Sequence, residues 1–232
     1  MKSNFDKGMN TMTLFRLDAS IRAEGSASRE IADIVEQEWL AAHPGETIER
    51  RHIGVDVLPA EAWGNAANAG YVPAEDRTPE QVAAVKLATT LTDELVNADA
   101  VLLAVPLYNW GVSQHIKVWF DLIMTDPRVR LPEPLLQGKP VVLVAVRGGG
   151  YAPGTPKHGW DHSTPYLRRM LGDLWGADLT VVERELTLAE VNPAMEPLRP
   201  LAAQMHAAAL DAALAAGRAF GVVPLASGAV GQ

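Results

Sequence analysis

Residues 98–111 read ADAVLLAVPLYNWG, and this stretch decides the fold class. The unbroken apolar run Ala100–Val105 is typical of a central strand in a parallel sheet, because such a strand is buried on both faces. The next residues, Pro106–Gly111, place two large aromatic side chains and an amide in one short turn. A helix is predicted directly afterwards, at Val112–Met124. A buried strand that ends in such a turn indicates that the turn has a role beyond connecting two elements.

The rest of the chain alternates between predicted strands and predicted helices. Further strands are predicted at Thr11–Asp18, Thr47–Ile53, Lys139–Val146 and Ala177–Leu186, and further helices at Ser26–Ala42, Thr78–Asn97, Ser163–Leu174 and Pro197–Phe220. The segment 54–77 is predicted to be irregular. Alternation of this kind predicts an α/β fold with one five-stranded parallel sheet and helices on both faces. The strand order 2-1-3-4-5 and a truncated dinucleotide-binding order both fit the pattern.

The overall composition limits the domain organisation and the class of function. The chain has 232 residues, of which 48% are hydrophobic, and this predicts a single domain at residues 11–221 with loose tails at 1–10 and 222–232. A net charge of -8 disfavours nucleic-acid binding, and the absence of cysteine excludes disulfides, thiolate metal sites and cysteine nucleophiles. No apolar run reaches the roughly 18 residues of a membrane span. These features predict a soluble cytoplasmic protein that does not associate with membranes.

Ligands of such sheets bind beyond the carboxyl ends of the strands, near the point where the strand order switches. The loops after the first, third and fourth predicted strands, at residues 19–28, 106–111 and 147–157, are therefore the expected ligand site.

The first of these loops is rich in serine. Ser20, Ser26 and Ser28 offer hydroxyl groups, and a helix that begins near Ser26 presents free N–H groups, which favour an anion. The dinucleotide fingerprint G-x-G-x-x-G and the phosphate-loop sequence G-x-x-x-x-G-K-[ST] are both absent. The loop thus predicts a site for a mononucleotide phosphate, and the alternative is that Ser26 only caps the helix.

The other two loops are suited to contact a planar ring. Tyr108 and Trp110 are predicted either to flank such a ring or to pack in the core, which is the usual fate of aromatic residues. The glycines at 148–150 expose backbone N–H groups that can bond to polar ring atoms, and the alternative is an ordinary flexible loop.

A metal site is not predicted. His158, Asp161 and His162 lie close together in the sequence, but they lack helical framing and other nearby ligands.

Taken together, three motifs resemble the FMN-dependent NADH-azoreductases, which are relatives of the NAD(P)H:quinone reductases. The motifs are Ser20 with Ser26-Ala27-Ser28, then Pro106-Leu107-Tyr108-Asn109-Trp110, and then Arg147-Gly148-Gly149. The resemblance extends over roughly residues 13–220. It implies a flavodoxin-like fold with strand order 2-1-3-4-5, and a homodimer that binds FMN near the interface between its subunits.

The resemblance also implies roles for individual residues. Ser20, Ser26, Ala27 and Ser28 would hold the phosphate of FMN. The flavin ring would be lined by Pro106, Leu107, Tyr108, Asn109, Trp110, Val146, Arg147, Gly148 and Gly149. The chain departs from the family at three positions: Trp110 stands where Phe is usual, Val146 where Ser or Thr is usual, and Ala27 where Gln is common. The wider face of Trp110 is expected to reshape the substrate slot.

The implied activity is a ping-pong transfer of hydride from NADH or NADPH to FMN, followed by two-electron reduction of a quinone or an azo compound. The cofactor carries the chemistry, so no catalytic side chain is required. Tyr151 is expected either to contact the acceptor or donate a proton to it, or only to pack on the scaffold. Within the segment 54–77, Trp63 and Tyr71 suggest a lid or a dimer arm. Two alternatives remain: a non-enzymatic flavin-binding electron carrier, and a hydrolase that uses Ser20, with Asp18 close to it in the sequence.

Overall fold

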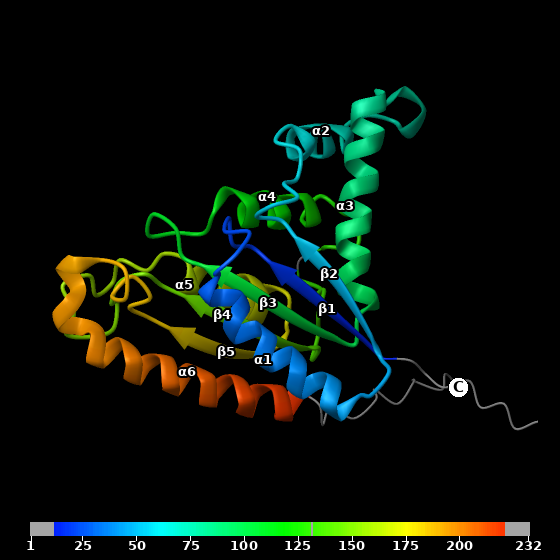
Figure 1. Ribbon diagram of the computed structural model, residues 1–232. Helices are drawn as coiled ribbons and strands as arrows, with labels where there is room; N and C mark the ends of the chain where they lie inside the picture. The colour runs from blue at the N-terminus through cyan, green and yellow to red at the C-terminus, as the bar shows by residue number, and fades with distance from the viewer. Residues whose placement is uncertain (1–11, 131, 221–232) are drawn as a thin grey trace, which may run out of the picture.

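Five parallel strands form the sheet at the centre of the protein, in the order β2-β1-β3-β4-β5 (Figure 1). The computed structural model describes residues 12–130 and 132–220, so the tails predicted at 1–10 and 222–232 lie outside the described residues. The strands are β1 (Thr13–Asp18), β2 (Thr47–His52), β3 (Ala100–Pro106), β4 (Pro140–Val146) and β5 (Asp178–Arg184). The predicted fold class and strand order are confirmed, and the truncated dinucleotide-binding order is excluded.

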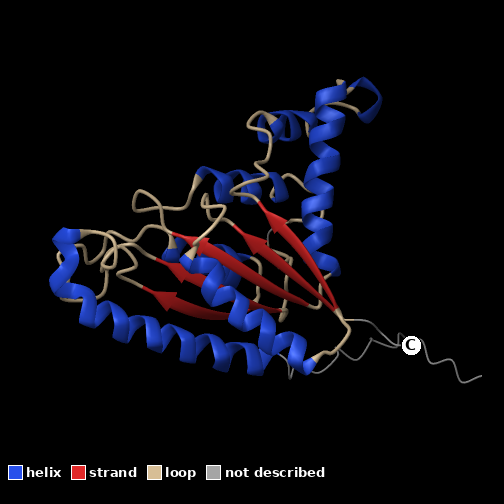
Figure 2. Ribbon diagram, in the orientation of Figure 1, coloured by secondary structure: helices blue, strands red, loops and turns tan. Residues whose placement is uncertain are grey.

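The apolar strands are buried from both sides, as the sequence of β3 predicts. Leu102 and Leu103 are adjacent in β3, at 0% and 1% exposed, yet they belong to separate hydrophobic clusters on opposite faces of the sheet. This follows from the strand geometry, because successive side chains point to opposite faces. Burying both faces requires a helical layer on each side (Figure 2).

Two helical layers cover the sheet. Helices α1 (Ala27–Ala42) and α6 (Arg199–Phe220) lie side by side on one face and share a core with alternate strand residues. The opposite face is covered by α3 (Pro79–Asn97), α4 (Gln114–Ile123) and α5 (Thr164–Arg168). No helix in the described part of the chain combines the length and the apolar character required to cross a membrane.

Helix starts follow the sequence signals closely. Thr78 and Gln81 form a capping box at the start of α3: the Gln81 N–H donates to Thr78 Oγ1 at 3.3 Å, and the Thr78 N–H donates to Gln81 Oε1 at 3.0 Å. Ser113 caps α4 in a similar way by accepting the N–H of Ile116. These caps satisfy N–H donors that a helix N-terminus leaves unpaired. They therefore fix the residues at which α3 and α4 begin.

The segment 54–77 is not irregular, and that prediction was wrong. It contains α2 (Ala62–Ala69) and a 3₁₀ turn, η1 (Ala74–Asp76). The buried residues Ala62, Ala66 and Ala69 fall at helical spacing, and α2 packs against α3 through this face. Alanine side chains are small and give a weak amphipathic signal, so the helical periodicity of α2 does not stand out in the sequence. Figure 1 shows α2 and the first turns of α3 projecting beyond the sheet.

Two predicted helices are also modified at their ends. The predicted helix 163–174 divides into α5 and a π-helical segment, η2 (Arg169–Leu174), and the Trp175 N–H bonds to the Met170 carbonyl five residues before it. Trp175 is 1% exposed and packs against Trp119 and Phe120. A 3₁₀ segment, η3 (Pro193–Leu198), precedes α6.

Candidate functional site

A cleft of about 1220 Å³ opens at the carboxyl edge of the sheet. The loops after β1, β3 and β4 and the segment after β5 form its walls, as expected for a fold of this topology. Most of the predicted site residues meet here. Those that line the cleft are Ser20, Ser26, Ala27, Ser28, Pro106, Leu107, Tyr108, Asn109, Trp110, Val146, Gly148, Gly149 and Tyr151.

The serine loop after β1 forms one end of the cleft. Ser26 is the N-cap of α1, and its Oγ accepts the Arg29 N–H at 3.4 Å and lies 3.1 Å from Ser28 Oγ. Ser20 Oγ accepts the Arg22 N–H at 3.2 Å. Ser26 therefore does cap the helix, and it also contributes a hydroxyl to the cleft. Hydroxyls beside the first-turn amides of a helix form a site that attracts an anion.

Gly54, at the end of the β2 segment, supports this loop by close backbone packing. A Cβ atom at Gly54 would lie 2.0 Å from the Ser20 carbonyl oxygen and 2.4 Å from the Ser20 carbonyl carbon. Only a residue without a side chain allows the two backbones to approach so closely. The position of Ser20 thus depends on a glycine that sequence reasoning did not single out.

The turn after β3 has a strained backbone. Tyr108 and Gly111 exchange two backbone hydrogen bonds, at 3.2 Å and 2.9 Å, and between them Asn109 and Trp110 have φ angles of 47° and 65°. Positive φ at both central residues defines a type I′ turn, for which Asn-Gly is the usual sequence. Tryptophan at the second position costs free energy, and strain of this kind is concentrated at functional sites.

Neighbouring loops hold this turn in place. The Trp110 carbonyl accepts the His162 N–H at 2.9 Å, and the Trp110 ring meets the ring of Trp160 edge to face, with 6.0 Å between centroids. The Tyr108 hydroxyl accepts the Ile21 N–H at 3.2 Å and so connects the turn to the serine loop. Trp110 itself remains 45% exposed, which leaves its face available at the cleft.

The glycine segment 148–150 follows β4 and forms the opposite wall. The carbonyls of Gly148 and Gly149 accept the N–H groups of Leu188 and Leu186, at 3.1 Å and 3.2 Å. Within residues 12–130 and 132–220, no acceptor pairs with the N–H groups of Gly148, Gly149 or Gly150. The segment is therefore held by its carbonyls, and its amides remain available to a ligand.

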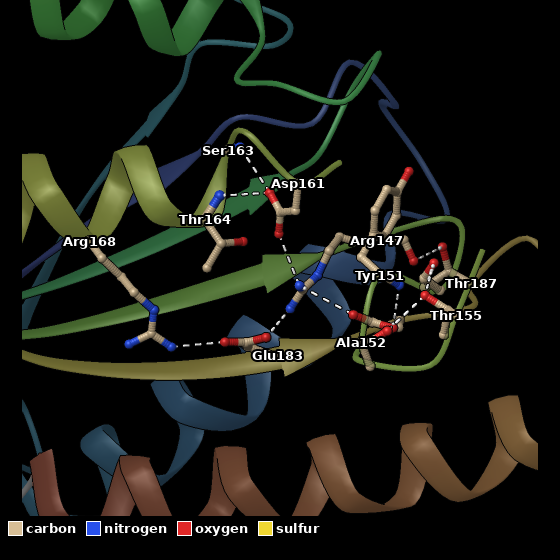
Figure 3. A network of polar contacts seen from close by, with 12 residues as sticks. Arg147, Tyr151, Ala152, Thr155, Asp161, Ser163, Thr164, Arg168, Glu183 and Thr187 are labelled. Carbon is tan, nitrogen blue, oxygen red and sulfur yellow. Dashed lines mark hydrogen bonds and ion pairs between the residues drawn. The ribbon is translucent and has the colours of Figure 1, made fainter. Parts of the chain in front are cut away.

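Arg147 is placed differently from the other predicted residues. The residue is 6% exposed, and the guanidinium lies among the carboxylates of Asp161, Glu183 and Glu185 rather than in the cleft (Figure 3). Its backbone N–H donates to the Arg184 carbonyl at 2.8 Å. The side chain of Arg147 thus contributes to the interior behind the glycine segment.

Tyr151 ends the glycine segment and is 9% exposed. Burial raises the pKa of its hydroxyl above the ordinary value of 10.0, and the nearby carboxylates of Asp161 and Glu185 raise the pKa further. The hydroxyl consequently stays protonated at neutral pH and can donate a hydrogen bond into the cleft.

The surroundings of Ser20 do not match those of a hydrolytic nucleophile. The Asp18 carboxylate accepts hydrogen bonds from the Arg16 guanidinium, at 3.2 Å and 3.3 Å, and it makes no hydrogen bond to Ser20. Ser20 Oγ instead contacts the Tyr108 hydroxyl and the Arg22 N–H. In the described part of the chain, no histidine hydrogen-bonds to Ser20, so the base that a serine nucleophile needs is lacking.

The described residues also contain no group of three His, Asp or Glu side chains placed to hold a metal ion. Asp161, which the sequence places between two histidines, is engaged by Arg147 and by the start of α5.

Sequence reasoning missed one wall of the cleft. The segment after β5 and the first turns of α6 contribute an apolar surface lined by Leu186, Leu188, Val191, Met195, Leu198, Leu201 and Met205. The signal was present, because β5 also ends at the carboxyl edge and its following residues are rich in leucine and methionine. Arg184 and Glu30 meet beside this wall at 2.7 Å.

The first comparison with known proteins concerns the fold family. Residues 12–217 match the model of a family described as having a flavodoxin-like fold. This match covers most of the chain, so the protein belongs to the flavodoxin-like family, and the predicted class is confirmed.

Within this family the chain belongs with the FMN-dependent NADH:quinone oxidoreductases. It is 39% identical to the enzyme of that name from Frankia casuarinae over 203 residues, which cover 86% of this chain and 96% of the relative. It is 40% identical to the one from Frankia alni over 185 residues, covering 78% and 87%. The crystal structure of an azoreductase from Bacillus anthracis superposes with a TM-score of 0.73 at 22% identity, over 90% of this chain and all of that one, which shows a shared fold.

The residues present fit FMN. The serine hydroxyls and the start of α1 suit a phosphate group, and the unpaired amides of the glycine segment suit the polar edge of a flavin ring. The apolar wall after β5 and the aromatic turn after β3 suit the flat surface of the ring. Each chemical part of the cofactor thus has a matching wall in one cleft.

Proposed function

We propose that the protein binds FMN in this cleft and acts as an FMN-dependent NADH:quinone oxidoreductase that also reduces azo compounds. One observation carries the proposal: serine hydroxyls at the start of α1 and glycine residues whose N–H groups have no acceptor among the described residues line one cleft, in a chain 39% identical to an FMN-dependent NADH:quinone oxidoreductase. The same elements on an unrelated sequence would support only a nucleotide site.

We assign a task to each wall of the cleft. Ser20, Ser26, Ala27 and Ser28 hold the phosphate. Pro106, Leu107, Tyr108, Asn109, Trp110, Val146, Gly148 and Gly149 line the ring. Arg147 acts through the backbone that it anchors, because its guanidinium is turned into the interior.

When bound, FMN would supply the redox chemistry, namely hydride transfer from NADH followed by two-electron reduction of a quinone or azo acceptor in a ping-pong cycle. The chain positions the ring and stabilises charge. The amides of Gly148–Gly150 favour negative charge that develops on the polar edge of the ring. The Tyr151 hydroxyl, protonated at neutral pH, can donate a hydrogen bond to the acceptor. The apolar wall after β5 limits access of water.

We also propose that the protein is a homodimer and that α2 belongs to its interface. Trp63 on α2 is 49% exposed, and Tyr71, two residues after the helix, is 91% exposed, although large aromatic side chains are usually covered. The arm formed by α2 and the start of α3 projects from the sheet and can reach a second copy (Figure 1). Replacing both residues with serine should yield monomers in sedimentation experiments, whereas an unchanged dimer would refute the role of the arm. The cytoplasmic location stays a prediction.

The experiment that tests the function uses the purified chain reconstituted with FMN under anaerobic conditions. The flavin absorbance should bleach on addition of NADH and return on addition of a naphthoquinone. Bound FMN that NADH does not reduce would instead identify an electron carrier. A chain that takes up no FMN would refute the proposal, and hydrolysis of an ester by that chain would favour the Ser20 hydrolase.

A further inference from the structure

The Arg147 side chain is buried and lies at the centre of an ion cluster whose outer members, Glu183 and Arg168, reach the surface (Figure 3). Its Nη1 lies 2.9 Å from Asp161 Oδ2 and 3.3 Å from Glu185 Oε1, and its Nη2 pairs with Glu183. Arg168 pairs with the other oxygen of Glu183 at 2.8 Å. Two cations therefore face three carboxylates, and Arg147 is the member that contacts all three.

One branch of the cluster fixes the glycine segment. Glu185 uses Oε1 for Arg147 and Oε2 to accept the Tyr151 N–H at 2.9 Å. The Arg147 carbonyl accepts the Thr187 N–H at 3.2 Å, so the residue is anchored at its backbone as well. The glycine segment is thus held at both ends, at Arg147 and at Tyr151, by groups that β5 and the residues after it supply.

A second branch reaches the opposite wall of the cleft. Asp161 uses Oδ2 for Arg147, while Oδ1 accepts the N–H groups of Ser163 and Thr164 at 2.9 Å each. The next residue in the chain, His162, donates its N–H to the Trp110 carbonyl at 2.9 Å. The orientation of Asp161 therefore determines the position of His162, whose N–H group supports the strained Trp110 turn.

The cluster is poorly suited to stability alone. Burial of charges is costly, and apolar residues of similar volume often stabilise a protein as well or better. In addition, the buried Nε of Arg147 has no acceptor among the residues that the structure describes. What the ion pairs provide is a fixed geometry between three backbone segments that belong to different loops.

We propose that Arg147 is a positioning residue that sets the distance between the two walls of the ring slot, through Glu185 to the glycine segment and through Asp161 to the Trp110 turn. This inference rests on the proposed function only where FMN is the probe. The geometry of the loops can be measured without any cofactor.

The test is the Asp161→Asn variant. Asparagine can still accept the N–H groups at the start of α5, but it removes the charge that pairs with Arg147. Hydrogen exchange of the cofactor-free protein should become faster in the peptides that contain Tyr151 and His162. FMN should bind roughly tenfold more weakly in a fluorescence titration, and the visible circular dichroism of bound FMN should change, because the slot loses its fixed width.

Asp126→Asn is the matched control. Asp126 is also buried, pairs with Arg128 at 2.8 Å and accepts a backbone N–H at 2.9 Å, but it follows α4 at the opposite edge of the sheet. It should destabilise the fold without changing exchange at Tyr151 and His162 or the affinity for FMN. The affinity of an Arg147→Lys variant for FMN should lie between the affinities of wild type and of an Arg147→Met variant. A lysine ammonium keeps the charge but cannot pair with three carboxylates at once.

Two results would overturn the inference. Unchanged exchange at Tyr151 and His162 in Asp161→Asn would show that the ion pair does not position the loops. Faster exchange combined with wild-type affinity and dichroism for FMN would show that loop position does not matter to the site. If wild-type protein binds no FMN, the proposed function fails, while the exchange result still decides whether Arg147 positions the loops.

Discussion

Two buried arginines in this protein have nearly the same surroundings and different consequences. Arg16 in β1 is 3% exposed and pairs with Asp18, Asp33 and Glu36. Arg147 is 6% exposed and also pairs with three carboxylates. The partners of Arg16 all lie on β1 and α1, which are regular elements with their own hydrogen bonds.

The partners of Arg147 act on loops. Two of its three carboxylates use a second oxygen to accept backbone N–H groups, Glu185 from Tyr151 in the loop after β4 and Asp161 from the residues where the loop before α5 enters that helix. An ion cluster between regular elements adds stability at most, whereas one between loops also sets loop position. The comparison teaches that the function of a buried charge depends on what its partners hold.

The largest expected effect tests the distinction between the Arg16 and Arg147 clusters directly. Arg147→Met and Arg16→Met each leave buried carboxylates without a cation, so each should lower the free energy of unfolding by about 3 kcal/mol or more. Only Arg147→Met should also abolish tight binding of FMN. Urea denaturation and FMN titration of the folded fraction measure the two effects. Equal loss of FMN binding in both variants would remove the distinction between the clusters.

A second prediction concerns the wall that relies on packing in place of charge. Gly54→Ala forces a Cβ atom against the Ser20 carbonyl, so the serine loop must move. Stability should fall by roughly 1–3 kcal/mol, and FMN affinity should fall with it. Gly64→Ala is the control: it has open space in α2 and should stabilise the protein by up to about 1 kcal/mol. A Gly54→Ala variant with wild-type affinity for FMN would contradict this view of the loop.

A third prediction separates the contribution of Trp110 to stability from its contribution to acceptor preference. Trp110→Gly removes the cost of a left-handed tryptophan but adds the entropy of a glycine and loses the contact with Trp160. Stability should therefore stay within about 1 kcal/mol of wild type, as measured by thermal unfolding. Trp110→Phe should retain FMN and shift the ratio of kcat/KM between quinone and azo acceptors. If both variants leave the acceptor profile unchanged, Trp110 only packs against its neighbours.

The smallest expected effect is a pH dependence that belongs to the Arg147 cluster. Burial raises the pKa of Glu183, but the charge of Arg147 and the hydrogen bonds from Arg147 and Arg168 outweigh it, so the pKa lies below the ordinary 4.5. A lowered pKa in the folded state contributes stability that is complete above pH 4.5 and is lost as pH falls through the folded value. Stability of wild type should thus decline more steeply below pH 4.5 than that of Glu183→Gln. Parallel curves in urea denaturation would refute the assignment.

The sequence predicted those parts of the fold that depend on local pattern. The apolar run of β3 and the helix predicted at Thr78–Asn97 depend on residues close together in the chain, and both were predicted correctly. The serine, aromatic and glycine loops line one cleft, because the topology of a parallel sheet brings its carboxyl ends together.

The remainder depends on contacts that pattern does not encode. The resemblance implied that Arg147 lines the ring slot, but its side chain pairs with carboxylates in and after β5, including Glu183, which is 36 residues away in the chain. The close approach of Gly54 to Ser20 and the hydrogen bond from His162 to the Trp110 carbonyl likewise join segments distant in the sequence. Residue type indicated which loops matter, and only the packed structure shows which way each side chain points.

The wall after β5 determines at what stage of chain synthesis the cleft can form. The glycine segment leaves β4 at residue 146, but the groups that fix its carbonyls and the Tyr151 amide lie at residues 185–188, and the apolar wall continues to Met205. A ribosome must therefore synthesise almost the whole chain before the cleft can close. The serine loop is synthesised early, but the segments that complete the cleft are synthesised last. The cofactor can therefore bind only when translation is nearly complete.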